Sequence, residues 1–502
     1  MLKRLSSAPP SLGVEREIKF ALDARAAGRL RTDPLLADIA PTSRRQVSQY
    51  WDTEDRALRA AGLSLRLRHF DDRTVQTIKR EADLAAGLLA RVEDEIPLDG
   101  TTPDLDALAR HVTPEFLAAI ANRLTPVFDV DVERTQWRLQ RDGSVLQFDL
   151  DEGVIHAGER EQAVLELEIE LAEGDAAPLF EVARELGRRI PLTLVFCTKS
   201  DRGYSLVGGA PCTPRRPQSV PLGPAATRAD AFRVTAMAAV RAFAIHAATF
   251  TEQAEAETVH AMRVALRRLR TLIRFDADLF SAREARALRR EIGWIFARLG
   301  AARDLDILMA ETAAWPPSTL SDHALAQLRR ARHVAYHAVA EALAAPRYRR
   351  GLLNFVALVE CGAWAGRPAA AKPAREGADA ALARQWRAVH DAGRPSKLSE
   401  KRRHKLRIHA KRLRYAADFY MTLYDGDRAA KRSAALLSAT TALQDILGLL
   451  NDRAMMKALI AERLPSIARR HLPPPTGRSE AELLAEADEA YRRLRGRKPF
   501  WN

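Results

Sequence analysis

Charged side chains alternate with apolar ones in several short segments of the first 205 residues. In "EREIKF" the side chains of Glu15, Glu17 and Lys19 share one face of an extended chain, and apolar side chains take the other. Carboxylate oxygens are ligands that Mg²⁺ and Mn²⁺ prefer, whereas lysine and arginine suit phosphate oxygens. A metal site beside basic side chains is what phosphoryl transfer requires.

The same alternation recurs along this region, and some faces carry mainly bases while others carry mainly carboxylates. The basic positions are Arg66, Arg68, Lys79, Arg91, Arg134, Lys199 and Arg202. The acidic positions are Glu93, Glu95, Asp149, Asp151, Glu166, Glu168 and Glu170. In an ordinary sheet with one buried face, such charged faces are exposed to solvent. In a sheet that closes into a barrel, the basic and the acidic faces both line one interior.

A second constellation lies in two basic segments of the other half, "VHAMRVALRRLR" and "HKLRIHAKRLRY". At 100° per residue each segment forms a helix with one apolar face and one row of cations. The rows are His260, Arg263, Arg267 and Arg270 in the first segment and His404, Arg407, Lys411 and Arg414 in the second. Acidic partners four residues away are almost absent, so like-charge repulsion costs each row about 0.2–0.5 kcal/mol per pair. A bound anion explains this repulsion, kept in both copies, better than a solvated face does.

The kind of anion follows from what the rows lack. Sites for nucleic-acid bases interleave aromatic rings with basic residues, and here only Tyr415 stands at one end. A ligand made of phosphate alone therefore fits better, and nucleic acid is not the expected partner. His260 and His404 are poor metal ligands, because each is a lone histidine flanked by arginine, but their titration would make anion binding sensitive to pH.

These constellations require two kinds of structural element. Period-two alternation predicts strands up to residue 206, with short helices at 103–122 and 176–189. A Pro- and Gly-rich linker follows over 207–225, and apolar spacings of three and four predict helices over 226–496. The basic segments, each followed by a related stretch ("LGAARDLDIL" and "LGLLNDRAMM"), repeat after about 145 residues. The repeat predicts two helical bundles packed about a pseudo-twofold axis.

Composition separates the two regions. Residues 1–205 hold 28 Lys and Arg against 36 Asp and Glu, a net −8, and residues 206–502 hold 51 against 29, a net +22. The basic region indicates a polyanionic partner. We expect no signal peptide and no membrane span, because no apolar run of about 18 residues is found. Three scattered cysteines argue against a disulfide framework or zinc cluster and indicate a cytoplasmic location.

The order of motifs over about 12–205 resembles the CYTH family, the triphosphate tunnel metalloenzymes: E-x-E-x-K, "YWDTEDRALRAAGLSLRLR", a lysine, R-x-E-x-E, E-x-E-x-E and K-S. The resemblance implies an α+β domain over 1–206, an eight-stranded antiparallel β tunnel with flanking helices. It implies hydrolysis of triphosphates with Mg²⁺ or Mn²⁺. The catalytic and phosphate-binding positions it implies are Glu15, Glu17, Lys19, Arg66, Arg68, Lys79, Glu93, Arg134 and Lys199. The metal positions it implies are Glu15 and Glu17 with members of Asp149, Glu166, Glu168 and Glu170, a set ambiguous by two residues.

The helical region resembles CHAD domains, through the two basic segments and "LQDILGLLND". That resemblance implies an all-α, internally duplicated domain whose basic surface binds long-chain polyphosphate. CYTH followed by CHAD implies an inorganic triphosphatase that forms diphosphate and phosphate, in the cytoplasm near polyphosphate deposits. A non-catalytic polyphosphate-binding protein and a hydrolase of nucleoside or thiamine triphosphate are the alternatives. The sequence sets neither the preferred metal nor the oligomeric state.

Overall fold

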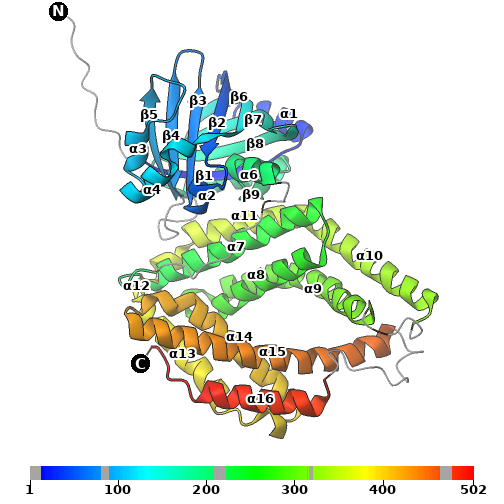
Figure 1. The fold of residues 1–502 in the computed structure, drawn as a ribbon. Helices are drawn as coiled ribbons and strands as arrows, with labels where there is room; N and C mark the ends of the chain where they lie inside the picture. Colours follow the sequence, from blue (N-terminus) through cyan, green and yellow to red (C-terminus); the bar gives the residue numbers. More distant parts are fainter. Residues whose placement is uncertain are drawn as a thin grey trace, which may run out of the picture. The chain divides into compact units, whose positions relative to one another are not determined.

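The computed structural model describes residues 13–80, 90–208, 212, 222–313, 315, 320–463 and 478–501, with the backbone alone described at 13–15 and 90–92. The chain divides into two compact units (Figure 1). The first contains the residues up to Pro214 together with Pro346–Cys361, and the second contains Arg215–Ala345 and Gly362–Asn502. The predicted linker, 207–225, lies mostly outside the described residues.

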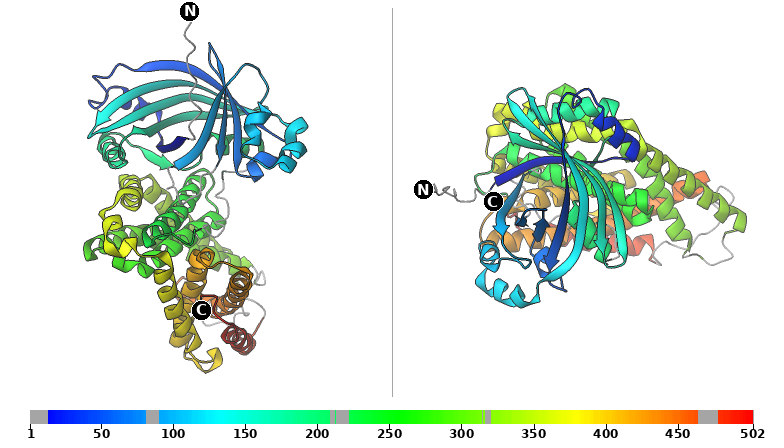
Figure 2. Two further views of the ribbon diagram at one scale, coloured as in Figure 1. Left: turned by 90° about the vertical axis from the view of Figure 1, so that its left-hand side faces the viewer. Right: turned by 90° about the horizontal axis from the view of Figure 1, so that it is seen from above.

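The first unit is built on one closed antiparallel sheet (Figure 2). Its strands are β1 (Gly13–Ala21), β2 (Thr42–Asp52), β3 (Leu63–His69), β4 (Thr74–Arg80), β5 (Ala90–Leu98), β6 (Thr125–Arg141), β7 (Ser144–Ala157), β8 (Arg160–Glu173) and β9 (Thr193–Val195). The order is β5-β4-β3-β2-β6-β7-β8-β1-β9, and a further β5–β1 pairing closes eight strands into a ring. The predicted antiparallel tunnel is confirmed, with a ninth short strand, β9, added beside β1.

Closure depends on β1, which changes partners along its length. Gly13–Arg16 pair with β5, and Glu17–Ala21 pair with β8. Close approach elsewhere in the ring needs a small residue: a Cβ on Gly153 of β7 would lie 2.0 Å from the carbonyl oxygen of Asp131 on β6. The alternation of the sequence then sends every second side chain to the inside of the ring.

Helices cover the outside and one end of the sheet. They are α1 (Ala24–Arg31), α2 (Ala57–Ala60), α3 (Leu105–Ala109), α4 (Pro114–Ile120), α5 (Ala177–Arg189), α6 (Lys199–Gly208) and α11 (Pro346–Cys361). The side chains of α5 that pack inward, such as Leu179 and Leu186, are fully buried, and each contributes about 1.5–3 kcal/mol. Phe20, Phe148 and Leu167, on the outer face of their strands, are equally buried.

The "YWDT" part of the CYTH-like signature has a structural role. The buried carboxylate of Asp52 accepts hydrogen bonds from the backbone N–H groups of Thr53 (2.8 Å), Leu58 (2.8 Å) and Arg59 (3.0 Å). It also accepts one from the Tyr204 hydroxyl on α6 (2.8 Å). Asp52 therefore fixes the turn after β2 and ties it to α6.

The second unit is all-helical, as predicted. Its helices are α7 (Arg228–Glu252), α8 (Ala256–Phe275), α9 (Ala282–Ala313), α10 (Asp322–Ala344), α12 (Pro368–Ala371), α13 (Ala374–His390), α14 (Glu400–Tyr420), α15 (Asp427–Arg463) and α16 (Glu480–Arg495). Helix α8 packs between α7 and α9, and α14 packs between α13 and α15. The equivalent helices of the two copies also meet, α7 with α13, α8 with α14 and α9 with α15. Contact of each helix with its own counterpart is the arrangement expected around a pseudo-twofold axis.

Two expectations need correction. Among the described helices, α7 and α15 are long and apolar enough to cross a membrane by length and composition, whereas we expected no such stretch from the sequence. The side chains of α7 are mostly buried within the unit, as in the core helix of a globular protein. In addition, Cys197 and Cys212 form a disulfide, so a bonded pair exists where scattered thiols were expected, and the Cys361 side chain is exposed.

Candidate functional site

The inside of the closed sheet collects most of the charged residues predicted for the first region. The carboxylates are the most deeply placed, with Asp151 at 0%, Glu166 at 2%, Asp149 at 3% and Glu168 at 8% exposure. Register explains their convergence, because β7 and β8 place Asp149 opposite Glu168 and Asp151 opposite Glu166. Strand β1 places Lys19 opposite Glu168 on the other side.

Glu168 lies at the centre of this network. Its carboxylate pairs with Lys19, with Lys199 (2.9 Å) and with Arg134 (3.0 Å). Lys19 also contacts Glu17 (2.9 Å). Burial alone would raise the pKa of Glu168, but Lys19, Lys199 and Arg134 hold it well below its usual range. The carboxylate is therefore charged, and three cations from three different elements surround it.

Arg134 and Lys199 each connect several carboxylates. The Arg134 guanidinium binds Asp151 in a bidentate pair (2.7 Å for each contact) and also contacts Asp149. The Lys199 ammonium lies 2.8 Å from both Asp151 and Glu166. Burial opposes the charge of Lys199, yet these carboxylates raise its pKa well above its usual value.

A second group lines the same interior on β3, β4 and β5. Lys79 pairs with Glu93 (3.0 Å), the residue opposite it across β4 and β5. Arg66 lies 3.5 Å from both Glu93 and Glu95. Arg68 has no ion-pair partner among the described residues, and its Nε donates to the Ser48 hydroxyl (3.4 Å). Burial and the nearby Arg66 and Arg134 lower the pKa of Arg68 to about 10, as expected for a cation that lacks an anion.

The position of α6 decides where the Lys199 side chain points. Its Gly203 faces the ring of Phe128 on β6, and a Cβ there would lie 2.2 Å from that ring. Thr198 accepts from the backbone N–H of Asp201 (3.0 Å), and Asp201 accepts from that of Thr198 (3.0 Å), which fixes the start of the helix. The absence of a side chain at Gly203 thus lets α6 lie against the sheet with Lys199 inside.

The structure brings most of the predicted residues together in this interior. Those with described side chains are Glu17, Lys19, Arg66, Arg68, Lys79, Glu93, Arg134, Asp149, Glu166, Glu168 and Lys199. The side chain of Glu15 lies outside the described residues, and Glu170 is half-buried near Gln147 (3.5 Å).

Further interior contacts involve Arg202, one of the predicted basic positions, and two residues that the sequence did not predict. Arg202 pairs with Glu166 (2.7 Å), and Thr77 donates to Glu95 (3.0 Å). Gln136 donates to Asp149 (2.8 Å). Thr77 and Gln136 are uncharged and gave no signal in the sequence.

Whether this interior suits a divalent metal ion is judged from the chemistry of its donor atoms. No group of three or more His, Cys, Asp or Glu side chains among the described residues is arranged to hold a metal ion. The carboxylates Glu17 and Glu168 nevertheless flank one shared cation, the Lys19 ammonium. Their hard oxygen donors fit Mg²⁺ or Mn²⁺.

The predicted cation rows of the second unit face the helices that follow them. Arg263 of α8 lies against α9, with its guanidinium over the Phe296 ring (4.7 Å), and is attracted to Asp304. In the other copy Arg407 of α14 lies 3.7 Å from Asp452 of α15. Asp304 and Asp452 occupy equivalent positions of the sequence repeat, so the two copies make equivalent contacts.

Cations from the two rows also approach one another. Burial and the nearby Arg267 and Arg407 lower the pKa of Lys411 to about 7. Burial and the nearby Arg267 also lower the pKa of Arg407, while Asp452 opposes this shift. The buried Nε atoms of Arg267 and Arg407 have no hydrogen-bond partner among the described residues. Mutual repulsion between α8 and α14 is thus only partly compensated.

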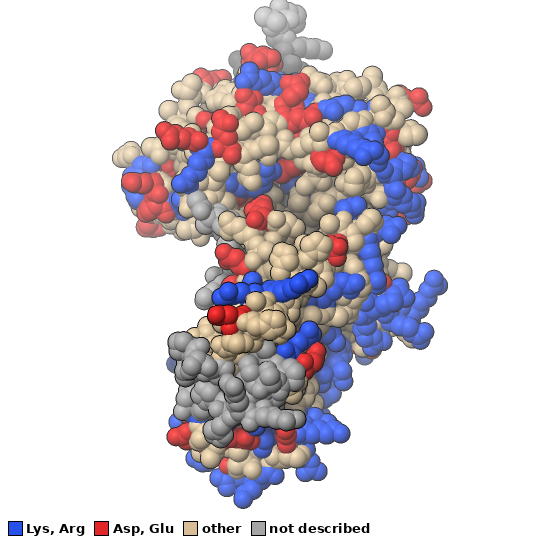
Figure 3. All heavy atoms as spheres, turned by 90° about the vertical axis from the view of Figure 1, so that its right-hand side faces the viewer, with Lys and Arg blue, Asp and Glu red and all other residues tan. Residues whose placement is uncertain are grey.

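The remaining members of the rows are less crowded. Arg270 and His404 are exposed, and His404 contacts Asn451 (2.6 Å). Arg414 donates to Gln444 (2.9 Å), and burial with the nearby Arg303 lowers the pKa of His260. A pocket of about 700 Å³ opens beside His404, and its basic lining residues are Lys401, Arg403, His404, Arg453 and Lys457. On the face that Figure 3 shows, Lys and Arg gather over the helical unit with few acidic neighbours.

Sequence comparison identifies both regions. Residues 13–200 match the CYTH domain, and residues 235–461 match the CHAD domain. The chain is a CYTH domain followed by a CHAD domain. The inorganic triphosphatase of Haemophilus influenzae is 31% identical over 157 residues, which are 31% of this chain and 44% of that protein. The match thus spans less than half the length of this curated relative.

Two solved structures resemble parts of the chain. The CHAD domain of the plant Ricinus communis is 25% identical with a TM-score of 0.46, covering 57% of this chain and 98% of its own. A putative adenylyl cyclase from Hippeastrum, described as having a dominant triphosphatase activity, is 19% identical with a TM-score of 0.27, covering 39% of this chain and 96% of its own. Both TM-scores lie below 0.5, so these likenesses add nothing to the sequence matches.

Proposed function

We propose that the CYTH domain hydrolyses inorganic triphosphate to diphosphate and phosphate with a divalent metal. The supporting observation is the interior of the closed sheet, where buried and half-buried lysines and arginines from β1, β3, β4, β6 and α6 face buried carboxylates. So many fixed charges in one enclosed space are costly unless they serve a highly charged ligand. The relationship to an inorganic triphosphatase supports the same substrate class.

The basic side chains would bind and orient the phosphate chain. Arg66, Arg68 and Lys79 lie on one side of the interior, and Lys19, Arg134 and Lys199 contact Glu168 on the other. Arg68, which has no carboxylate partner among the described residues, is the strongest candidate for direct contact with phosphate. Fixed cations along the chain stabilise the charge that moves to the leaving diphosphate as water attacks the terminal phosphorus.

Glu17 and Glu168, with Glu170 nearby on β8, would hold the metal ion. When bound, Mg²⁺ or Mn²⁺ neutralises phosphate oxygens and lowers the pKa of a coordinated water. Lys19, between Glu17 and Glu168, compensates these two carboxylates. Its ammonium would be free to turn to the substrate once the carboxylates have another cation.

Phosphate release from tripolyphosphate, measured with each metal, tests the catalytic proposal. Glu168→Gln keeps the size of the side chain and removes its charge, and we expect a rate lower by roughly 10²–10³. Glu159→Gln, on the exposed turn after β7, is the matched control and should retain the wild-type rate. Equal rates for wild type and Glu168→Gln would reject catalysis in this interior. Nucleoside and thiamine triphosphates in the same assay separate an organic from an inorganic substrate, and no turnover of any of them favours a binding protein.

We propose also that the CHAD domain binds long-chain polyphosphate through the two cation rows. The support is the only partly compensated positive charge between α8 and α14, where the buried Nε atoms of Arg267 and Arg407 have no hydrogen-bond partner among the described residues. Arg263→Ala combined with Arg407→Ala should weaken binding and flatten its salt dependence, because fewer counterions are released. Arg329→Ala with Arg330→Ala, exposed on α10, removes the same charge elsewhere. If RNA displaces the bound polyphosphate as readily as polyphosphate displaces RNA, the preference for phosphate chains is wrong.

A further inference from the structure

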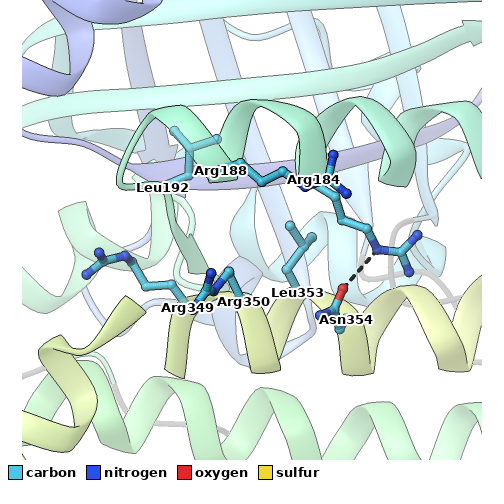
Figure 4. Close-up of a pocket in the computed structure, with 8 residues that line it drawn as sticks. Arg184, Arg188, Leu192, Arg349, Arg350, Leu353 and Asn354 are labelled. Atoms are coloured by element: carbon cyan, nitrogen blue, oxygen red, sulfur yellow. Dashed lines mark hydrogen bonds between the residues drawn. The ribbon is translucent and has the colours of Figure 1, made fainter. Parts of the chain in front are cut away.

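Another cluster of arginines shares no residue with either candidate site. A pocket of about 90 Å³ in the first unit is lined by residues of α5 and α11 and by Leu192 (Figure 4). Half of its eight lining residues are arginines, namely Arg184, Arg188, Arg349 and Arg350, and none is acidic. We propose that this pocket binds a single phosphate group, either as free orthophosphate or as one unit of a phosphate chain.

The arginines come from two helices, and a hydrogen bond positions one of them. Arg184 Nε donates to the Asn354 side-chain oxygen (2.9 Å), which directs this guanidinium from α5 toward α11 (Figure 4). Among the described residues, Arg188 and Arg350 have neither an ion-pair nor a hydrogen-bond partner, and both are exposed. These two side chains are therefore available to an anion that enters from solvent.

The helix dipoles of α5 and α11 act differently on the arginines of this cluster. Arg188 lies in the last turn of α5, where the helix dipole favours a cation. Arg349 and Arg350 lie within the first five residues of α11, where the dipole disfavours one, and the first turn of α11 has no acidic residue. An anion between the helices would offset both the dipole and the repulsion among the arginines.

The size and lining of the pocket select the anion. The volume, about 90 Å³, is small, which suits one tetrahedral oxyanion better than a nucleotide. Planar guanidinium groups bind two phosphate oxygens at once. Leu192 and Leu353 supply apolar walls, and no aromatic ring lines the pocket on which a base could stack. A phosphate group without a nucleoside is the ligand that this chemistry fits.

Arginine modification by phenylglyoxal, read by mass spectrometry on the full chain, tests the site directly. We expect orthophosphate or long-chain polyphosphate to slow the modification of Arg188 and Arg350 more than that of Arg25 and Arg29, two exposed arginines of α1. Protection by orthophosphate identifies a free anion, and protection by polyphosphate alone identifies a unit of a chain. If neither anion protects Arg188 and Arg350 beyond the α1 pair, the proposal is wrong.

Equilibrium dialysis with whichever anion protects gives an independent measure. Arg188→Gln with Arg350→Gln should lower its affinity at this site by roughly tenfold or more for each lost guanidinium, the scale of a charge-assisted hydrogen bond. Arg25→Gln with Arg29→Gln should leave binding unchanged, and unchanged binding in the Arg188 and Arg350 variant would overturn the site. Hydrolysis of tripolyphosphate is measured on the same samples, so failure of this site is distinguishable from failure of the proposed activity.

Discussion

Lys199, the first residue of α6, lies 2.9 Å from Glu168 on β8. The contact joins a helix that follows the sheet in sequence to the most highly compensated carboxylate of its interior. Both groups are buried, and each shifts the pKa of the other toward its charged form. This pair anchors the cluster on which the proposed chemistry depends.

Removal of the Lys199 ammonium should damage both stability and activity. Lys199→Met leaves Asp151, Glu166 and Glu168 short of a cation, and loss of one partner of a buried pair costs about 3–5 kcal/mol. A double-mutant cycle with Glu168→Gln, measured by urea unfolding, should show that the two changes together cost less than their sum. Strict additivity would mean that Lys199 and Glu168 do not interact in solution.

Acid should destabilise the first unit through Glu168. Its pKa is lowered in the folded protein, so the unfolded chain, with a pKa of about 4.3, binds protons first as the pH falls. The stability from this carboxylate is therefore complete above about pH 4.3 and is lost as the pH falls toward the folded pKa. Urea unfolding between pH 7 and pH 3 should show a weaker pH dependence for Glu168→Gln. Asp149, whose pKa is raised by burial, acts in the opposite direction.

Gly203→Ala tests the placement of α6 without changing any charge. The new methyl group would meet the Phe128 ring at 2.2 Å, so either α6 or the ring must move, and Lys199 moves with the helix. We expect a loss of about 1–3 kcal/mol, the usual cost of overpacking, and a lower rate of tripolyphosphate hydrolysis. Gly28→Ala, on α1 with open space around it, should instead stabilise by about 0.5–1 kcal/mol. A similar gain at both positions would contradict the close contact.

Polyphosphate binding should strengthen as the pH falls from 8 to 6. Lys411, with a pKa of about 7, gains its proton in this interval. The charged groups that act on it are Arg267 from α8, Arg407 and Arg414 from α14, and Asp452 from α15. At constant ionic strength Lys411→Met should bind more weakly at pH 6 and lose most of the pH dependence. Dependence that persists in Lys411→Met would assign the effect to the histidines of the rows.

Local sequence patterns were sufficient for most strands, for the helices of the second unit and for the faces that the charged residues share, but not for α6 (Lys199–Gly208), a helix where alternation predicted a strand. Strand alternation puts Glu166, Glu168 and Glu170 on one face whichever of them binds metal, and helical spacing puts Arg263 and Arg267 on one stripe. Both periodicities are properties of the backbone and need no long-range contact. The duplicated motifs also indicated two equivalent helical copies, because similar sequences adopt similar folds.

Tertiary structure alone decided which charges meet. The pairing of β7 with β8 and of β1 with β8 makes Glu168 the centre of the cluster, and strand register depends on contacts between residues far apart in the chain. The approach of α6, permitted by Gly203, carries Lys199 inside, and the α8–α14 contact brings Arg267 near Lys411. The grouping of α11 with the first unit, and hence the arginine pocket beside α5, had no local signature, because it depends on packing between segments more than 150 residues apart.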